Sequence, residues 1–302
     1  MQKLFEFLRL AWRQQNAVYR IGEVFSSAFS GGFSVKRIFA GLLAIIEMFG
    51  CVLFDYPLTP AGQELSLDGY SLVFEDEFEG GSLDADVWFF RSSGGRRGGY
   101  NAPSQIKVEN GNLIITAEYL ENGESGEGWY AGAVSLRQQY CRGYFEIKCK
   151  CNDGGDFWSA FWIQASNPYD HDISKGGPGG AELDIFEAPY GGKKLSPLYN
   201  SVTQTIHCNG SDDDPEHIDS RMLGIFKGNN IYTEYNTYGL EWTEDEYIFY
   251  INGVETARSS FGSGVSQVDE SVIVSLELPD EITLDKDYSS QFIVDYVRIY
   301  QK

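Results

Sequence analysis

The most informative stretch of this 302-residue chain reads Gly180-Ala181-Glu182-Leu183-Asp184-Ile185-Phe186-Glu187-Ala188. Large apolar residues are interleaved with acids there, as in a strand with one buried face. Side chains alternate across a strand, so Glu182 and Asp184 would share a face and Glu187 would point away. One extra residue, a β-bulge at Ile185–Phe186, would return Glu187 to that face. Three carboxyl groups on one face repel one another, so we expect at least one to keep its proton to unusually high pH.

This acidic row favours catalysis over a solvated acidic surface. Acidic residues number 44 of 302, so the spacing alone proves little. The apolar residues between the acids change the interpretation, because they predict a rigid and partly buried site where carboxyl pKa values are perturbed. Cleavage of a glycosidic bond requires two rigidly held carboxyl groups whose pKa values are pushed apart. The row is therefore a candidate glycosidase site.

The net charge and the composition limit the classes of molecule that this protein is expected to bind. The net charge of −21 argues against nucleic acid, whose recognition depends on basic surfaces. It also disfavours sulfated polysaccharides, which such a surface would repel, and favours a neutral polymer. Aromatic residues make up 15% of the chain, enough to supply both a core and faces that stack on sugar rings. The five cysteines form no recognisable framework. We expect a monomer that binds a neutral β-linked polysaccharide.

The N-terminal part differs physically from the rest. Residues 1–54 contain six basic and three acidic residues, a net +3, which leaves −24 for the remainder. The pair Lys36-Arg37 precedes a mostly apolar run, Ile38–Phe54, which Glu47 interrupts. Three interpretations stay open: an uncleaved membrane-associating segment, a long secretion signal, or amphipathic helices packed on the domain. We favour membrane targeting or attachment through residues 1–54, and we expect an extracytoplasmic protein.

The second part of the chain predicts an all-β domain. The N-terminal segment comprises residues 1–60 and ends in a stiff linker, Tyr56–Pro60. A separate domain follows at residues 66–302. Asn252-Gly253 predicts a tight hairpin, since both turn positions need positive φ. Many short strands without helices between them indicate a sandwich or jelly roll. The predicted strands are Ser71–Phe78, Gly111–Leu120, Ala133–Tyr140, Gly143–Cys151, Phe157–Gln164, Ala181–Glu187, Ser201–Cys208, Tyr247–Ile251, Val254–Arg258, Ser271–Leu278 and Gln291–Tyr300.

Several blocks flank the acidic row in a characteristic order. They are Phe74–Phe78 with Leu83 and Trp88, Val108–Leu113, Tyr140–Lys150, Phe157–Trp162, Tyr238–Trp242 and Asp295–Tyr300. Together they resemble glycoside hydrolase family 16, the family of laminarinases, lichenases, agarases and carrageenases, over about residues 66–302. The six-residue acidic row, with its extra residue, is similar to the laminarinase and agarase branches. The resemblance implies a concanavalin-like β-jelly-roll sandwich that carries an N-terminal helical or hydrophobic extension.

The resemblance also implies roles for the acids. Glu182 would be the nucleophile, Glu187 the general acid/base, and Asp184 the residue that hydrogen-bonds the nucleophile. The family retains anomeric configuration, so the reaction would be a double displacement through a glycosyl-enzyme intermediate without a catalytic cofactor. The implied activity is that of an endo-β-glycanase, with β-1,3-glucan or mixed-linkage β-1,3/1,4-glucan as the favoured substrate.

Further residues match the family's binding positions. Trp158 and Trp162 would share a strand face and stack on sugars, and a core role is the alternative. His207 matches a histidine beside the acceptor subsites. Loop positions that match the donor side are Tyr100, Asn101 and Trp129. The residues that match a structural calcium site are Glu77, Gly111 (through its carbonyl) and Asp295.

Two departures from common laminarinases leave the polysaccharide open. Ser159 stands where a proline is usual, and the segment Ser211–His217 is unusually acidic. A β-galactan is therefore the alternative substrate. A non-catalytic carbohydrate-binding protein of the same fold is the alternative class, although a binder has no need of three repelling acids.

Overall fold

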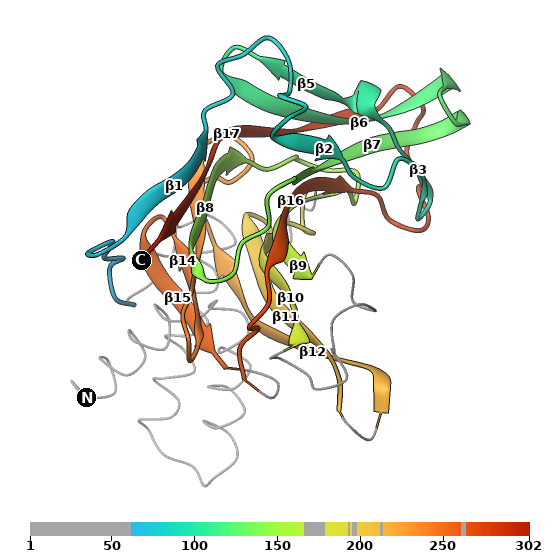
Figure 1. Ribbon diagram of the computed structural model, residues 1–302. Coiled ribbons are helices and arrows are strands. Elements are labelled where there is room, and N and C mark those ends of the chain that lie inside the picture. The colour runs from blue at the N-terminus through green and yellow to red at the C-terminus, as the bar shows by residue number, and fades with distance from the viewer. Residues whose placement is uncertain (1–61, 166–178, 193, 195–197, 212–213, 261–263) are drawn as a thin grey trace, which may run out of the picture.

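The structure, a computed structural model, describes residues 62–165, 179–192, 194, 198–211, 214–260 and 264–302 (Figure 1). The N-terminal segment 1–60, with its three interpretations, lies outside these residues. Within them, no helix has the length and apolar character needed to cross a membrane.

The described chain is built almost entirely of strands. A single turn of 3-10 helix, Pro103–Gln105, interrupts them in this part of the chain. The strands are β1 (Ser71–Asp76), β2 (Trp88–Phe90), β3 (Gly94–Arg96), β4 (Gly99–Asn101), β5 (Ile106–Glu109), β6 (Asn112–Gly123), β7 (Gly126–Leu136), β8 (Gly143–Lys150), β9 (Trp158–Ala165), β10 (Glu182–Glu187), β11 (Ser201–Ser211), β12 (Asp214–Lys227), β13 (Asn236–Trp242), β14 (Tyr247–Ile251), β15 (Val254–Ser259), β16 (Glu270–Glu277) and β17 (Ser289–Gln301).

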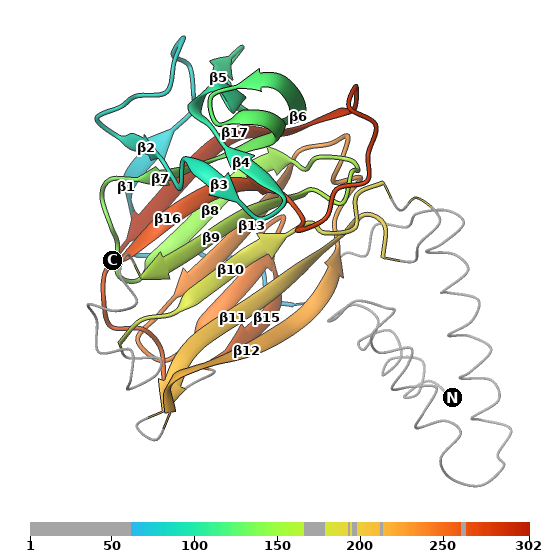
Figure 2. The same ribbon diagram turned by 90° about the vertical axis from the view of Figure 1, so that its right-hand side faces the viewer.

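The strands form two layers. The first, called here the β10 sheet, has the antiparallel order β2-β7-β16-β9-β10-β11-β12. The second, the β8 sheet, runs β15-β14-β13-β8-β17, and β17 continues to β1 at one end and to β6 at the other. Strand β7 joins the two layers, because it pairs with β16 in one and with β6 in the other. Figure 2 turns the outer face of the β10 sheet toward the viewer.

The core lies between the layers. From β10, the side chains of Leu183, Ile185 and Phe186 are fully buried in it. The ring of Phe186 stacks on that of Tyr238 from β13, with centroids 4.0 Å apart. Each such side chain contributes about 1.5–3 kcal/mol by leaving water. This packing fixes which face of β10 points outward, and it confirms the all-β sandwich.

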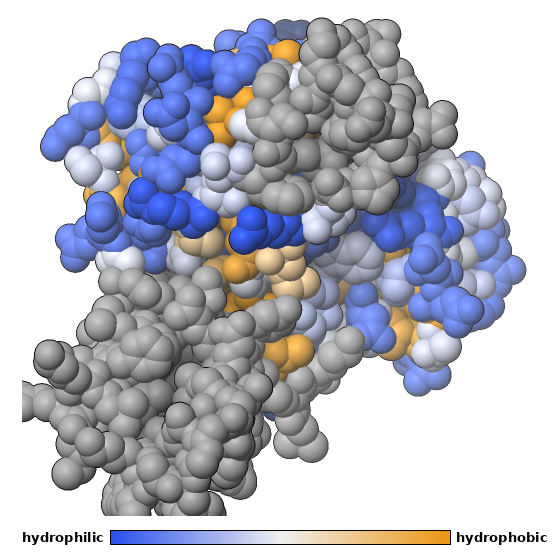
Figure 3. Space-filling model, turned by 90° about the horizontal axis from the view of Figure 1, so that it is seen from below, coloured by the Kyte–Doolittle hydropathy of each residue, from blue (hydrophilic) through white to orange (hydrophobic). Residues whose placement is uncertain are grey.

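The strand predictions were right in the apolar segments and incomplete elsewhere. The hairpin at Asn252-Gly253 is confirmed, with φ of 51° and 74°. Strands β2 to β5, β12 and β13 were not predicted. β12 is an edge strand that pairs only with β11 among the described residues. Its sequence is largely polar and begins in the acidic segment noted above, so it carries no apolar alternation to reveal it. The face drawn in Figure 3 is mostly hydrophilic where the structure describes it, with hydrophobic residues in a band across its middle.

Candidate active site

A bulge in β10 brings the three acids to one face. Against β11, Asp184 pairs with Thr205 and Glu187 with Thr203, so three steps along β10 match two along β11. Against β9 the register slips between Asp184 and Phe186. Ile185 and Phe186 therefore both enter the core, and Glu187 returns to the outer face that Glu182 and Asp184 share. The bulge predicted at these two residues is confirmed.

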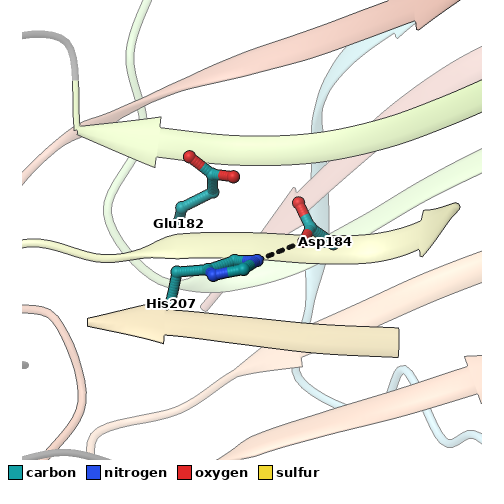
Figure 4. Close-up of side chains that lie close together, drawn as sticks. All are labelled: Glu182, Asp184 and His207. Carbon is teal, nitrogen blue, oxygen red and sulfur yellow. Dashed lines mark hydrogen bonds and ion pairs between the residues drawn. The ribbon is translucent and has the colours of Figure 1, made fainter. Parts of the chain in front are cut away.

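The neighbouring strands supply the surroundings of the row. The residues opposite the three acids on β9 are Gln164, Trp162 and Ala160, and those on β11 are His207, Thr205 and Thr203. Figure 4 shows Glu182 and Asp184 projecting from β10 on the same side as His207 from β11. Because pairing register and alternation place these side chains, their arrangement follows from the backbone rather than from a mobile loop.

Glu187 has the environment of a proton donor. Burial raises the pKa of its carboxyl group to about 7, and the negative charge of Asp184 contributes to the shift. The indole of Trp158 opposes the shift, because its Nε1–H donates to Oε1 of Glu187 at 2.8 Å and favours the ionised form. Glu187 is therefore mostly protonated below pH 7. One of the three acids does keep its proton to unusually high pH, but burial is the main cause and repulsion by Asp184 only adds to it.

Glu182 is held as a hydrogen-bond acceptor. Nε2 of Gln164 donates to its Oε2 at 2.5 Å, and the oxygen of the same amide accepts from Nη2 of Arg91 at 2.9 Å. Burial and the charge of Asp184 raise the pKa of Glu182, whereas His207, Gln164 and Arg91 all favour its ionised form. These partners distinguish Glu182 from Glu187, which has the indole alone as donor among its described contacts.

Asp184 and His207 form a hydrogen-bonded pair at the centre of the row. Nε2 of His207 lies 3.0 Å from Oδ2 of Asp184, and Nδ1 lies 2.6 Å from Oγ of Ser220 on β12. The hydrogen bond to Asp184 raises the pKa of His207. Burial raises the pKa of Asp184, and the same hydrogen bond works against that shift. The sequence pointed to His207, but nothing local pointed to Ser220, which register alone places beside it.

One group of side chains in the described residues has the spacing of a metal site. The donor atoms of Glu182, Asp184 and His207 lie within 4.8 Å of one another. Asp184 and His207 already bond each other, and Glu182 already accepts from Gln164. The three side chains therefore use their donor atoms in hydrogen bonds to one another and to Gln164, and they make the contacts of a hydrogen-bonded row of carboxyl groups.

The two predicted tryptophans lie outside the main core. Trp162, Ala160 and Ile273 form a small separate cluster on the outer face, and Trp158 packs against it. Trp162 is 7% exposed; its Nε1 donates to Oγ of Ser275 at 3.1 Å, and the guanidinium of Arg91 lies 4.5 Å from the centre of its ring. Trp158 is half-buried and touches the row directly. Sugar stacking stays a prediction for both.

The three donor-side positions lie in strands, so their predicted placement in loops was wrong, and donor-side binding stays a prediction. Trp129 belongs to β7, is 7% exposed and packs against Phe157 in the main core. Asn101 and Tyr100 belong to β4, which pairs in parallel with β7. Asn101 is buried, and Tyr100 packs against Tyr130 with ring centroids 5.1 Å apart. The glycine-rich sequence around β3 and β4 gives no strand signal at Tyr100 and Asn101.

The residues predicted to hold calcium do not fit a calcium site as they lie. Glu77 accepts hydrogen bonds from Nε and Nη2 of Arg298 at 2.9 and 2.6 Å. Asp295 is paired with Nζ of Lys148 at 2.7 Å. Gly111 adopts φ of 71° in the turn between β5 and β6. Since both carboxylates are neutralised by cations, the contacts give this prediction no support.

An arginine cluster beside the row was missed from the sequence. Besides Arg91, it contains Arg96, which binds Glu277 at 2.7 Å, and Arg97, whose guanidinium lies 5.0 Å from the centre of the Trp158 ring. Glu277 also lies 3.6 Å from Arg97 and is buried. The signal was present, because Arg96-Arg97 is a basic pair inside a glycine-rich stretch of an acidic domain.

The comparisons with known proteins agree with this geometry. A family model described as Beta-porphyranase A-D, GH16 domain, matches residues 72–302. A glucan endo-1,3-beta-glucosidase of Cryptopygus antarcticus is 25% identical over 246 residues, which cover 74% of this chain and 86% of that enzyme. A keratan-sulfate endo-1,4-beta-galactosidase of Sphingobacterium multivorum is 26% identical over 250 residues, covering 77% of this chain but only 55% of that enzyme, so the chain spans about half its length.

The fold has a solved counterpart. The crystal structure of SCLam, a non-specific endo-beta-1,3(4)-glucanase from family GH16, matches with a TM-score of 0.63 at 22% identity, over 80% of this chain and 95% of that one. The family model spans nearly the whole described domain and includes the bulged acidic row. The chain therefore belongs to glycoside hydrolase family 16 and is a glycosidase.

Proposed function

We propose that this enzyme is a retaining endo-glycanase that hydrolyses β-1,3-glucan or mixed-linkage β-1,3/1,4-glucan. The observation that carries the proposal is the bulged row on β10, which gives Glu182 and Glu187 one shared face and different partners. Two carboxyl groups with unlike environments are the requirement of glycoside hydrolysis.

The environments assign the roles. Glu182, held by the Gln164 amide with Arg91 behind it, attacks the anomeric carbon as a carboxylate and forms the glycosyl-enzyme ester. Glu187, protonated below pH 7, gives its proton to the departing glycosidic oxygen. In the second half, Glu187 takes a proton from water, whose oxygen attacks the anomeric carbon and releases Glu182. No cofactor enters either step.

Asp184 acts on Glu187 through its negative charge. Together with burial, this charge raises the pKa of Glu187 and so keeps the proton donor protonated, and the hydrogen bond from His207 to Asp184 offsets part of the charge. When Glu187 releases its proton, repulsion from Asp184 favours taking it back from water. This cycling is what an acid that later acts as a base requires.

The names of relatives support a glucan substrate. The Cryptopygus antarcticus enzyme is named an endo-1,3-beta-glucosidase, and SCLam is described as a non-specific endo-beta-1,3(4)-glucanase. The indole of Trp158, which is half-buried beside Glu187, offers an aromatic face to a sugar ring at the point of cleavage. The net charge of −21 also fits a neutral polymer.

The arginine cluster favours a second candidate, an anionic β-galactan. Arg96 and Arg97 share one buried counter-charge, Glu277, and Arg91 lies beside them without an ion pair among the described contacts, so three arginines gather on this side of the row. Burial lowers the pKa of Arg91, and the nearby Arg96 adds to the effect. The charged form of Arg91 is therefore destabilised, and an anionic ligand beside it would stabilise that form. The matching family model is named for β-porphyranases, and one relative is named for keratan sulfate.

A substrate panel distinguishes the candidates. Soluble β-1,3-glucan, mixed-linkage β-glucan, agarose, sulfated galactan and keratan sulfate are each incubated with the wild type and with Glu182→Gln. We expect oligosaccharides from the two glucans, released with a β reducing end that NMR detects before mutarotation, and none from E182Q. An α reducing end would contradict the retaining mechanism.

Arginine variants test the second candidate on the same panel. Arg91→Gln should slow cleavage of sulfated galactan about tenfold or more beyond its effect on glucan cleavage, if the cluster binds a sulfate or carboxylate. The ratio of the two rates is the measure, because Arg91 also bonds the Gln164 amide that holds Glu182 and its loss slows cleavage of every substrate. Arg258→Gln is the matched control, because Arg258 bonds Glu255 and Glu246 on the exposed side of the β8 sheet. An equal ratio in R91Q and R258Q for every anionic polymer would eliminate this candidate.

A further inference from the structure

A buried acid outside the catalytic row, Glu270, contacts the backbone next to the nucleophile. Glu270 begins β16, lies opposite Ala165 at the end of β9, and is completely buried. Its Oε1 accepts a hydrogen bond of 2.8 Å from the backbone N–H of Ala181. Ala181 immediately precedes Glu182, so the carboxyl group of Glu270 contacts the peptide that leads into the row.

The contact completes the hydrogen bonding of Ala181. Its carbonyl accepts from the backbone N–H of Ala165 at 3.2 Å, and its N–H has the Glu270 side chain as partner. The backbone N–H and carbonyl of Ala181 are thus both hydrogen-bonded at the point where the chain enters β10. The preceding residue, Gly180, has φ of 136°. A buried N–H without an acceptor is unfavourable, so losing this bond would favour movement of the strand end.

Glu270 is itself held firmly in place. Its backbone N–H and carbonyl both bond Tyr140, at 2.9 and 3.0 Å. No ion pair of Glu270 is found in the described part of the chain, and its Oε2 has no hydrogen-bond partner there. A buried carboxylate without an ion pair is costly, and burial raises the pKa of Glu270 to about 8. Hydrogen bonds from Ser266 and the Ala181 N–H oppose this rise, and the neighbouring acid Glu182 adds to it. The group is therefore an uncharged acceptor at neutral pH.

We propose that Glu270 is a positioning residue for Glu182: its side chain holds the Ala181 N–H and fixes the end of β10 from which the nucleophile projects. The proposal rests on the function proposed above. Glu270 touches neither substrate nor the reacting atoms, so it acts only through the backbone. An uncharged acid suits this place, because it accepts a hydrogen bond without adding a second negative charge behind Glu182.

Three substitutions of Glu270 test separately the length of its side chain, the presence of an acceptor oxygen and the side-chain volume. Glu270→Gln keeps both the length and an acceptor oxygen without charge. Glu270→Asp keeps the acid but withdraws it by one methylene, and Glu270→Met keeps the volume but has no oxygen. The control is Thr256→Val, which removes a buried hydroxyl on β15 that bonds Gln204 and the carbonyl of Phe249 but neither Ala181 nor an acid of the row.

The expected result is a loss in kcat rather than in binding. E270M and E270D should lower kcat about 10- to 100-fold, as misplacement of a reacting group by about 1 Å does. KM should stay within about twofold, because the binding contacts are not altered. E270Q should restore kcat to nearly the wild-type value, and T256V should keep it. Hydrogen exchange of the peptide that contains residues 181–187 should be faster in E270M and E270D than in E270Q.

The outcomes separate this proposal from the function it rests on. Wild-type kcat and exchange in folded E270M or E270D would overturn it, and so would E270Q as slow as E270M. If E270M does not fold, the comparison of E270D with E270Q decides. If the wild type hydrolyses no polysaccharide but exchange still rises in E270D, the proposed function fails and the positioning role stands.

Discussion

Replacing Trp158 by phenylalanine should move the pH limit of activity upward. The indole Nε1–H donates to Oε1 of Glu187 at 2.8 Å, and this bond lowers the pKa that burial and Asp184 raise to about 7. Phenylalanine keeps an aromatic face but has no donor. The carboxylate form of Glu187 therefore loses a stabilising contact, while the protonated form loses little.

The magnitude follows from the strength of the bond. A hydrogen bond to an ionised group contributes about 1.5–3 kcal/mol. At about 1.4 kcal/mol per pKa unit, the pKa of Glu187 should rise by about 1–2 units, from about 7 to about 8–9. At pH 8 the wild type then keeps roughly a tenth of its acid protonated, whereas the variant keeps roughly half to nine-tenths.

The assay is the pH profile of kcat/KM on a soluble β-glucan between pH 5 and 10, since this ratio reports the free enzyme. Trp162→Phe is the matched control, because it makes the same substitution four residues away. In the wild type, the Nε1–H of Trp162 donates to Ser275 rather than to an acid of the row. We expect the alkaline limb of W158F to shift and that of W162F to stay. A folded W158F whose limb stays at, or falls below, the wild-type position would refute the assignment of Glu187 as the proton donor.

Four further outcomes are expected. Glu187→Gln should lower kcat about 10²- to 10⁴-fold, and Glu182→Gln at least as much, with the fold retained by circular dichroism; near-normal turnover in either would contradict its role. Asp184→Asn should move the alkaline limb of kcat/KM to lower pH, opposite to W158F, because the charge that raises the pKa of Glu187 is removed. The free energy of unfolding should fall as the pH rises from about 5 to 8. The reason is that the pKa values of Glu187 and Glu270 are raised to about 7 and 8 in the folded state, which therefore binds more protons than the unfolded state in this range. Denaturant unfolding at several pH values should show this decrease, and the decrease should be smaller in Glu270→Gln. Deletion of residues 1–56 should leave activity on soluble glucan unchanged and lower recovery in the membrane fraction; a deletion variant that aggregates would instead favour packing of that segment on the domain.

Much of the architecture was predictable because it depends on local pattern. The alternation in segments such as Gly143–Cys151 and Gln291–Tyr300 predicted strands that the structure contains as β8 and β17. Asn252-Gly253 predicted its hairpin for a purely local reason, the ability of both residues to adopt positive φ. Short strands in glycine-rich sequence, such as β3 and β4, carry no such pattern and were missed.

The sequence by itself determined the acidic row and its bulge. Three acids among buried apolar residues can share a face only if one residue is inserted, so the requirement for a bulge at Ile185–Phe186 could be read from spacing. The types of the residues also pointed to the chemistry, because carboxyl groups held in a partly buried strand are the groups that glycoside hydrolysis requires.

Only the tertiary structure decided what surrounds each acid. Trp158 beside Glu187, Gln164 beside Glu182, and Glu270 behind Ala181 come from strands that are distant in sequence. Their contacts depend on the pairing of β9, β10 and β16, which no local pattern specifies. The pKa of a carboxyl group depends on burial and on charges within a few ångströms, so the division of roles between Glu182 and Glu187 is set by packing rather than by composition.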